Sequence, residues 1–297
     1  MIAATEAPEL VPCPEPGLYP DATFGEYRSW RAVNAGTICR GRRSMAHLRH
    51  WLRTPPKPAT DSMRKGSLIH AAKLEPLALL ERYVVMPAFE DQVRKPDGSE
   101  YTAPKLSKAY KELVAEFTAA NSHREVVSQQ WYDDMLGMLE AIRRHGRASH
   151  YLGGDGPTEL SVVWTDPDTG IKCKARYDKI DHDHKALPDL KTTADAQRFE
   201  QTIARFSYHI RGAFYEDGWK AVTGDDYTYC LVAVETEAPY GIRAAPLGNT
   251  ASAVGRQIYK ETLRQCAQAK ATNEWPSYLN PLEWSLPSWA LPEGENE

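Results

Sequence analysis

The segment that decides the predicted fold spans residues 158–193 and reads TELSVVWTDPDTGIKCKARYDKIDHDHKALPDLKTT. Two β-rich runs, residues 158–165 and 171–181, flank the turn DPDTG, a pattern typical of a β-hairpin. A second turn, HDHK, leads to a third short strand, ALPDLKTT. This segment therefore predicts strands that follow one another closely in one sheet.

Helical patterns lie on both sides of this β-rich segment. Apolar residues recur at helical spacing in several windows, and two strand-like runs follow the last but one helix. The predicted helices span residues 43–53, 62–74, 106–121, 128–146, 195–204, 207–222 and 250–271, and further strands span residues 80–87, 226–236 and 240–246. This order predicts an α+β or mixed α/β fold and excludes a Rossmann or barrel pattern.

The length of 297 residues fits one large domain. Residues 1–22, rich in Pro and acidic residues, are predicted to form a flexible N-terminal arm, and residues 23–297 a single domain with a helical region at about 88–150. The hydrophobic fraction of 42% and charged fraction of 26% are ordinary for a globular protein.

The net charge of −4 excludes a protein that coats nucleic acid through bulk charge, so any such contact needs a local patch. One candidate runs from Arg28 to Lys57, where eight residues are basic and none is acidic. A solvated helix face is the simpler interpretation of this run when it is considered alone.

Several classes of protein are disfavoured by what the sequence lacks. Five scattered cysteines with no C-x-x-C pair argue against a disulfide framework or a cysteine-ligated metal site. The N-terminus has no signal-peptide pattern, and no run approaches the roughly 20 apolar residues of a membrane span. We expect a soluble protein in the cytoplasm.

Chemistry is indicated by Asp178 and by the sequence Asp189-Leu190-Lys191. Side chains alternate across a strand, so Asp189 and Lys191 point to one face, and Asp178 comes from the preceding strand. Two carboxylates that meet form an oxygen-rich site suited to Mg²⁺, or to Mn²⁺. Lys191 can orient or help to deprotonate an attacking water and offset charge on a phosphate. D-x-K at a strand end is common by chance, so the neighbouring motifs decide its meaning.

Three further motifs accompany this group. The first, GSLIHAAKLEP, places Gly66 and His70 four residues apart on a predicted helix. The second sets Glu159, Lys174 and Arg176 on the strands before the D-x-K-T-T sequence. The third, YHIRGAFYEDG, places Arg211 and Tyr215 four apart, and hence on one helix face.

Together these motifs resemble the PD-(D/E)XK nucleases, specifically the phage and prophage exonuclease VIII (RecE) type and more distantly the RecB nuclease domain. The resemblance runs from about residue 24 to 291 and includes the tail EWPSYLNPLEWSLPSWA. It implies a central mixed sheet flanked by helices. One departure is Arg211, which stands where the family has Gln and puts the substrate contact there in doubt.

The resemblance also implies roles for individual residues. Metal ligands would be Asp178, Asp189 and His70, with the Leu190 carbonyl as a further ligand, while Glu159 would support the site. Lys191 would complete the catalytic group. DNA contacts would come from six residues: Arg211, Tyr215, Arg176, Arg40, Arg42 and Arg43.

The implied activity is a magnesium-dependent exonuclease that degrades linear double-stranded DNA 5′ to 3′ in phage-type recombination. Its partners would be double-stranded DNA and a single-strand annealing protein, and it would form a homo-oligomer. Three alternatives stay open: an endonuclease with the same core, a DNA-binding protein that has lost activity, and a hydrolase of a small phosphorylated molecule. His182-Asp183-His184 could bind a transition metal, although a polar turn is the simpler interpretation.

Overall fold

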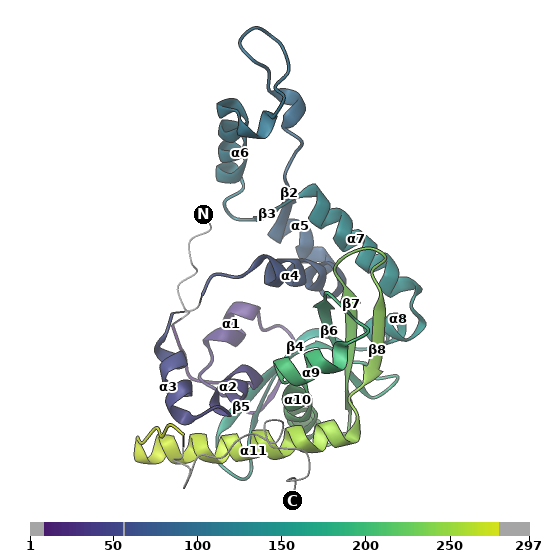
Figure 1. The fold of residues 1–297 in the computed structure, drawn as a ribbon. Coiled ribbons are helices and arrows are strands. Elements are labelled where there is room, and N and C mark those ends of the chain that lie inside the picture. The colour runs from purple at the N-terminus through teal and green to yellow at the C-terminus, as the bar shows by residue number, and fades with distance from the viewer. Residues whose placement is uncertain (1–8, 56, 279–297) are drawn as a thin grey trace, which may run out of the picture.

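The hairpin predicted from residues 158–193 is present in the computed structural model, which describes residues 9–55 and 57–278 (Figure 1). β4 (Thr158–Thr165) and β5 (Lys172–Lys179) pair antiparallel across the DPDTG turn. β1 (Gly17–Tyr19) adds to the outer edge of β4, also antiparallel. This part of the segment predicted as a flexible arm is thus held in the first sheet, whose order is β1-β4-β5.

The third predicted strand, β6 (Ala186–Thr193), belongs to a second sheet of order β6-β7-β8. It runs parallel to β7 (Thr228–Glu235), which pairs antiparallel with β8 (Ile242–Pro246). A parallel pair needs a long crossover, and two helices supply it. Within the described residues, the strands of the predicted mixed core thus form two three-stranded sheets, the first antiparallel and the second mixed.

β5 and β6 do not form the ladder that a second hairpin would require. Between them the described pairing is a single bridge, Asp181 to Ala186. Farther along, the Leu190 amide donates to the Asp178 carboxylate at 2.9 Å instead of to a backbone carbonyl of β5. A side chain thus takes the place of the backbone partner, and the two strands diverge around it.

Short helices precede the first hairpin, and most begin at a polar residue whose side chain accepts a backbone N–H of the first turn. The capping residues are Thr23, Asn34, Ser44 and Thr60, and the helices are α1 (Phe24–Ser29), α2 (Ala35–Gly41), α3 (Met45–Arg53) and α4 (Asp61–Leu74). Helices α3 and α4 match predicted helices, whereas α1 and α2 were not predicted.

The middle of the chain projects away from the two sheets (Figure 1). Its stem is a parallel pair of short strands, β2 (Tyr83–Val85) and β3 (Glu125–Val127), and it carries α6 (Lys108–Ala120). The flanking helices are α5 (Leu79–Arg82), α7 (Gln129–Arg144) and α8 (Gly146–Gly153), with 3₁₀ turns at Pro76–Ala78, Glu90–Gln92 and Pro104–Leu106.

The crossover from β6 to β7 consists of α9 (Phe199–Phe206) and α10 (Tyr208–Thr223). The last helix, α11 (Asn249–Thr272), packs across α10. A Cβ atom at Gly255 would stand 2.0 Å from the His209 carbonyl oxygen, so only glycine permits this close crossing. The three helices agree with the predicted ones to within a few residues.

The second sheet separates two hydrophobic clusters. Leu187 and Leu231 face the cluster that includes α10, while Leu190 and Val232 face the cluster formed with α4, α7 and α8. Asp189 and Lys191 share the α10 face with Leu187, because residues two apart on a strand point the same way.

The described helices include none long and apolar enough to cross a bilayer. The tail beyond residue 278 lies outside the described residues.

Candidate active site

Asp189 and Lys191 lie side by side on β6, as strand alternation predicts. The Lys191 ammonium contacts the Asp189 carboxylate, donates to the Leu190 carbonyl at 2.9 Å and stands 3.8 Å from Asp178 Oδ2. Asp189 is 2% exposed, and its carboxylate oxygens accept no hydrogen bond of regular geometry within the described residues. A buried carboxylate in this state favours a nearby cation.

His70 reaches this group from α4. Its Nε2 lies 2.6 Å from the Leu190 carbonyl oxygen, and its Nδ1 lies 3.5 Å from Asp178 Oδ2. One turn earlier on the same helix face, a Cβ atom at Gly66 would stand 3.4 Å from the Thr192 hydroxyl of β6. Gly66 and His70 thus both face β6, and the imidazole reaches the strand at Leu190.

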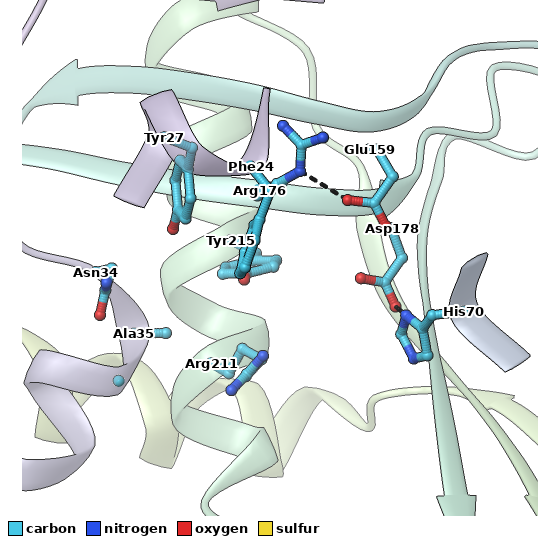
Figure 2. Close-up of a pocket in the computed structure, with 11 residues that line it drawn as sticks. Phe24, Tyr27, Asn34, Ala35, His70, Glu159, Arg176, Asp178, Arg211 and Tyr215 are labelled. Carbon is cyan, nitrogen blue, oxygen red and sulfur yellow. Dashed lines mark hydrogen bonds and ion pairs between the residues drawn. The ribbon is translucent and has the colours of Figure 1, made fainter. Parts of the chain in front are cut away.

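Glu159 has a left-handed backbone, with φ of 53°, and drops out of the β4–β5 pairing register. This conformation costs a non-glycine residue about 1 kcal/mol or more. It places the carboxylate against Arg176, whose Nε donates to Glu159 Oε2 at 2.7 Å (Figure 2). Strain of this kind is concentrated at functional sites, and the supporting role of Glu159 stays a prediction.

The surroundings shift the pKa values of Asp178 and Asp189 in opposite directions. Burial raises the pKa of Asp178 above its usual value, the charge of Asp189 raises it further, and His70 and Lys191 only partly oppose this. Burial would also raise the pKa of Asp189, but Lys191 and Arg211 outweigh it and hold that pKa low. Asp189 is therefore the ionised partner of Lys191, and Asp178 is the carboxylate that gains most from another cation.

Lys191 is held in its charged form. Burial by itself would lower the pKa of Lys191, but the Asp189 and Asp178 carboxylates outweigh it and keep the pKa above its usual value. Burial and the charge of Asp178 likewise raise the pKa of Glu159. A charged lysine can donate hydrogen bonds and stabilise negative charge, but it does not accept a proton.

The residues present fit a small divalent cation. One nitrogen of His70 and one oxygen each of Glu159 and Asp178 lie within 4.8 Å of one another. Ligands of Mg²⁺ bind at about 2.0–2.1 Å, so two ligands on opposite sides stand roughly 4 Å apart. Small side-chain adjustments would let this group close around one ion, with the Leu190 carbonyl beside it.

A cavity of about 340 Å³ opens onto these groups, and Figure 2 shows Arg211 and Tyr215 entering it from α10. The Arg211 guanidinium lies 6.0 Å from the ring centres of Tyr208 and Tyr215. Within residues 9–55 and 57–278, no carboxylate pairs with it. A partly buried cation of this kind, facing a cavity, is suited to an anionic group such as a phosphate.

Comparison with known proteins agrees with this arrangement. A family model described as "PDDEXK-like domain of unknown function (DUF3799)" matches residues 33–283. The chain belongs to this family. The match covers the hairpin, the D-x-K sequence and the helices that carry His70 and Arg211, so the predicted PD-(D/E)XK fold class is confirmed.

A solved structure resembles this PDDEXK-like domain in fold. The crystal structure of a "putative exonuclease" from Eubacterium rectale is 12% identical with a TM-score of 0.55, covering 89% of this chain and 93% of that one. The protein SSO0001 is 17% identical, covers 67% of this chain and 85% of its own, and has a TM-score of only 0.28. No curated protein matches this sequence significantly.

Not all predicted DNA-binding residues of the PDDEXK-like domain reach the cavity. Arg176 lines it, but its guanidinium is already held by Glu159, Ser161 and the Ala22 carbonyl. Arg40, Arg42 and Arg43 lie at the far end of α2, whose first residues line the cavity. A seven-residue helix spans about 10 Å, so these three arginines stand outside the catalytic group.

Sequence reasoning missed the wall of the cavity opposite His70. Phe24 and Tyr27 come from α1, and Asn34, Ala35 and Gly36 from the start of α2. Asn34 carried a usable signal, since Asn before a short apolar pattern is a common helix cap. Phe24 and Tyr27 carried none, because their place depends on contacts with β5, far along the chain.

The histidines of the His182–His184 turn form hydrogen bonds inside the protein. His182 lies 2.8 Å from the Tyr227 hydroxyl, and His184 lies 2.8 Å from the Asp181 carboxylate.

Proposed function

We propose that this PDDEXK-like protein is a metal-dependent deoxyribonuclease that hydrolyses phosphodiester bonds at the ends of linear double-stranded DNA. The observation that carries the proposal is that His70, Glu159 and Asp178 line one cavity together with Arg211. Asp189 and Lys191 contact each other next to Asp178. These groups can hold a cation, a water molecule and a phosphate close together.

Each residue of the site has its own role in this proposal. Asp178, His70 and Glu159 would hold Mg²⁺ or Mn²⁺, with Asp189 and the Leu190 carbonyl beside them. When bound, such an ion polarises a phosphate and lowers the pKa of water. Lys191 donates a hydrogen bond that orients the attacking water and offsets the charge developing on the phosphate.

Arg211 and Tyr215 position the substrate. The guanidinium can donate two parallel hydrogen bonds to a non-bridging pair of phosphate oxygens, which a glutamine at the same place could not do. The nearly buried Tyr215 ring forms the wall behind it. In this proposal, Arg211 binds phosphate more strongly than the glutamine that the exonuclease VIII type has at this position.

The size of the cavity favours an exonuclease over an endonuclease. A volume of about 340 Å³ is at the lower end for small-molecule sites, and it fits one nucleotide of a single strand. A duplex is too wide to enter, so the scissile bond reaches Asp178 most easily at a frayed end. By the resemblance, cleavage proceeds 5′ to 3′, in phage-type recombination with an annealing partner protein and a homo-oligomeric enzyme.

The deciding experiment incubates the purified protein with linear duplex DNA and with closed circular DNA, with Mg²⁺, with Mn²⁺ or with EDTA. We expect metal-dependent loss of the linear DNA alone, and release of a 5′ label before a 3′ label. Cutting of the circle would replace the exonuclease with an endonuclease. Binding of DNA without any cleavage would identify a protein that has lost the activity.

A further inference from the structure

The arginines between positions 28 and 53 differ from most others in the protein. Within the described residues none of these seven forms an ion pair with a carboxylate. Elsewhere in the same part of the chain most exposed arginines are paired, such as Arg143 and Arg144 with Glu140, and Arg243 with Glu200. Charge that is not neutralised within the protein is available to an anionic partner.

Part of this charge lines a groove that is separate from the catalytic cavity. The groove has a volume of about 450 Å³ and lies between α3 and the segment that follows α11. Its lining residues are Ala46, Arg49, His50, Arg53, Thr54 and Trp275. They include cationic and aromatic side chains but no carboxylate.

The groove has a fixed floor and an aromatic wall. The Ala46 amide donates to the Pro276 carbonyl at 2.9 Å, which ties the start of α3 to the chain beyond α11. The Arg49 guanidinium lies 5.7 Å from the ring centre of Trp275, so a cation and an indole stand together on one side. Arg53 and His50 are exposed at the rim, one helical turn or less from Arg49.

Helix α2 connects the part of the protein that carries this groove with the catalytic cavity. Helix α2 packs against α10 on one side and against α3 on the other, as Figure 1 shows. Its first residues line the cavity, and Arg40 and Arg42 stand at its end, where the chain turns into α3. The Arg40 guanidinium stacks over the exposed Trp51 ring of α3 at 5.4 Å.

We infer that the α3 groove binds single-stranded DNA, with Arg49 and Arg53 on its phosphates and Trp275 against a base. Arginine next to an aromatic side chain in a groove is the usual chemistry of single-strand binding, because every base offers a flat face to stack. A duplex contact would need cations on an open surface and no aromatic wall. This inference rests on the proposed nuclease function, which makes DNA the substrate. The groove would add a second DNA contact outside the cavity, for a strand next to the one that is cut.

The test measures binding of the full-length protein to fluorescent oligothymidylate and to a blunt duplex, in EDTA at several salt concentrations. The variant is Arg49→Gln with Arg53→Gln, which removes charge and keeps helix propensity. The matched control is Arg143→Gln with Arg144→Gln, an equal change of charge on α7. A lost phosphate contact should weaken single-strand binding about fivefold at roughly 0.1 M salt and reduce the salt slope by about 0.7.

For the groove variant we therefore expect about 25-fold weaker oligothymidylate binding and a salt slope reduced by about 1.4. The control variant should stay near the wild type. Equal effects of the two variants, or a loss confined to the duplex, would overturn the inference. Hydrolysis of bis(p-nitrophenyl) phosphate, too small to reach α3, should be unchanged by the groove variant.

The diester assay also separates this inference from the proposed function. Suppose that the wild-type protein cleaves neither DNA nor the diester, but the groove variant still loses oligothymidylate binding. The nuclease proposal would then be wrong, and the inference that the groove binds single-stranded DNA would be supported. If cleavage is normal and the groove variant binds like the control, the groove fails and the nuclease stands.

Discussion

The Asp178 carboxylate accepts a hydrogen bond from the Leu190 backbone amide at 2.9 Å, and this contact joins the two sheets at the candidate active site. The same oxygen faces His70 and Lys191. One side chain therefore has both a structural and a proposed chemical role, and substitutions can separate the two.

Replacing Asp178 by Asn should stop cleavage and preserve the fold. The amide oxygen can still accept from Leu190, but the negative charge that attracts a cation is lost. We expect cleavage to fall about a thousandfold, equivalent to roughly 4 kcal/mol of transition-state stabilisation. Asp168→Asn, which alters a surface carboxylate paired with Lys260, is the control in the same assay. Wild-type cleavage by Asp178→Asn would remove Asp178 from the site.

Replacing Lys191 by Met should separate metal binding from catalysis. Lys191 is a proposed donor and not a ligand, and its removal leaves Asp178 and Asp189 as unbalanced carboxylates that bind a cation more strongly. Cleavage should fall at least about a hundredfold. Thermal stabilisation by Mn²⁺ should be kept or increased. Loss of that stabilisation would contradict the role given to Lys191.

Replacing Arg211 by Gln, the residue of the resembled family, should weaken substrate binding more than turnover. A charged hydrogen bond is worth about 1.5–3 kcal/mol, so KM for DNA should rise tenfold or more while kcat changes little. Steady-state kinetics with linear duplex DNA measures both. A large fall in kcat at unchanged KM would instead place Arg211 in the transition state alone.

The strained Glu159 should make stability depend on pH in the absence of metal. Its pKa is raised in the folded protein, so folding favours the protonated form. The penalty is absent below the unfolded pKa of about 4.5 and fully present above the folded pKa. Glu159→Gln should therefore unfold at a higher temperature than the wild type at pH 8 in EDTA, and the difference should close toward pH 4. A difference that grows on acidification would contradict this sign.

Lys174 should be important for stability although it is not part of the site. Its buried ammonium donates to the Tyr27 and Trp30 carbonyls, both at 2.6 Å, at the end of α1. Lys174→Met leaves those carbonyls unsatisfied and should cost about 2–4 kcal/mol in urea unfolding. Lys172→Met removes a lysine whose partner Glu15 is exposed and should cost less than about 1 kcal/mol. Similar costs for the two variants would show that Lys174 does not hold α1.

The sequence was most informative where local patterns carry the structure. Alternation along β6 placed Asp189 and Lys191 on one face. The position of His70 beside this group was implied only by the resemblance to PD-(D/E)XK nucleases, and its imidazole lies at the Leu190 carbonyl. The assignment of these residues to catalysis stays a prediction. Local patterns could not show that β5 and β6 diverge, because the Leu190 amide could equally have paired with a backbone carbonyl. They also could not place α1, which is held by Lys174 from 147 residues away.

That distance along the chain has a consequence for how the protein is made. β1 pairs with β4, and Lys174 fastens α1, only after the first hairpin exists. During synthesis the N-terminal helices emerge well before these partners, so the apolar faces of Tyr27 and Trp30 stay uncovered while the intervening chain is translated. Contacts of such long range slow folding, and the nascent chain is exposed to aggregation for that interval. Assembly of the cavity wall is thus a late event, and an incomplete chain that stops before β5 has no means to build it.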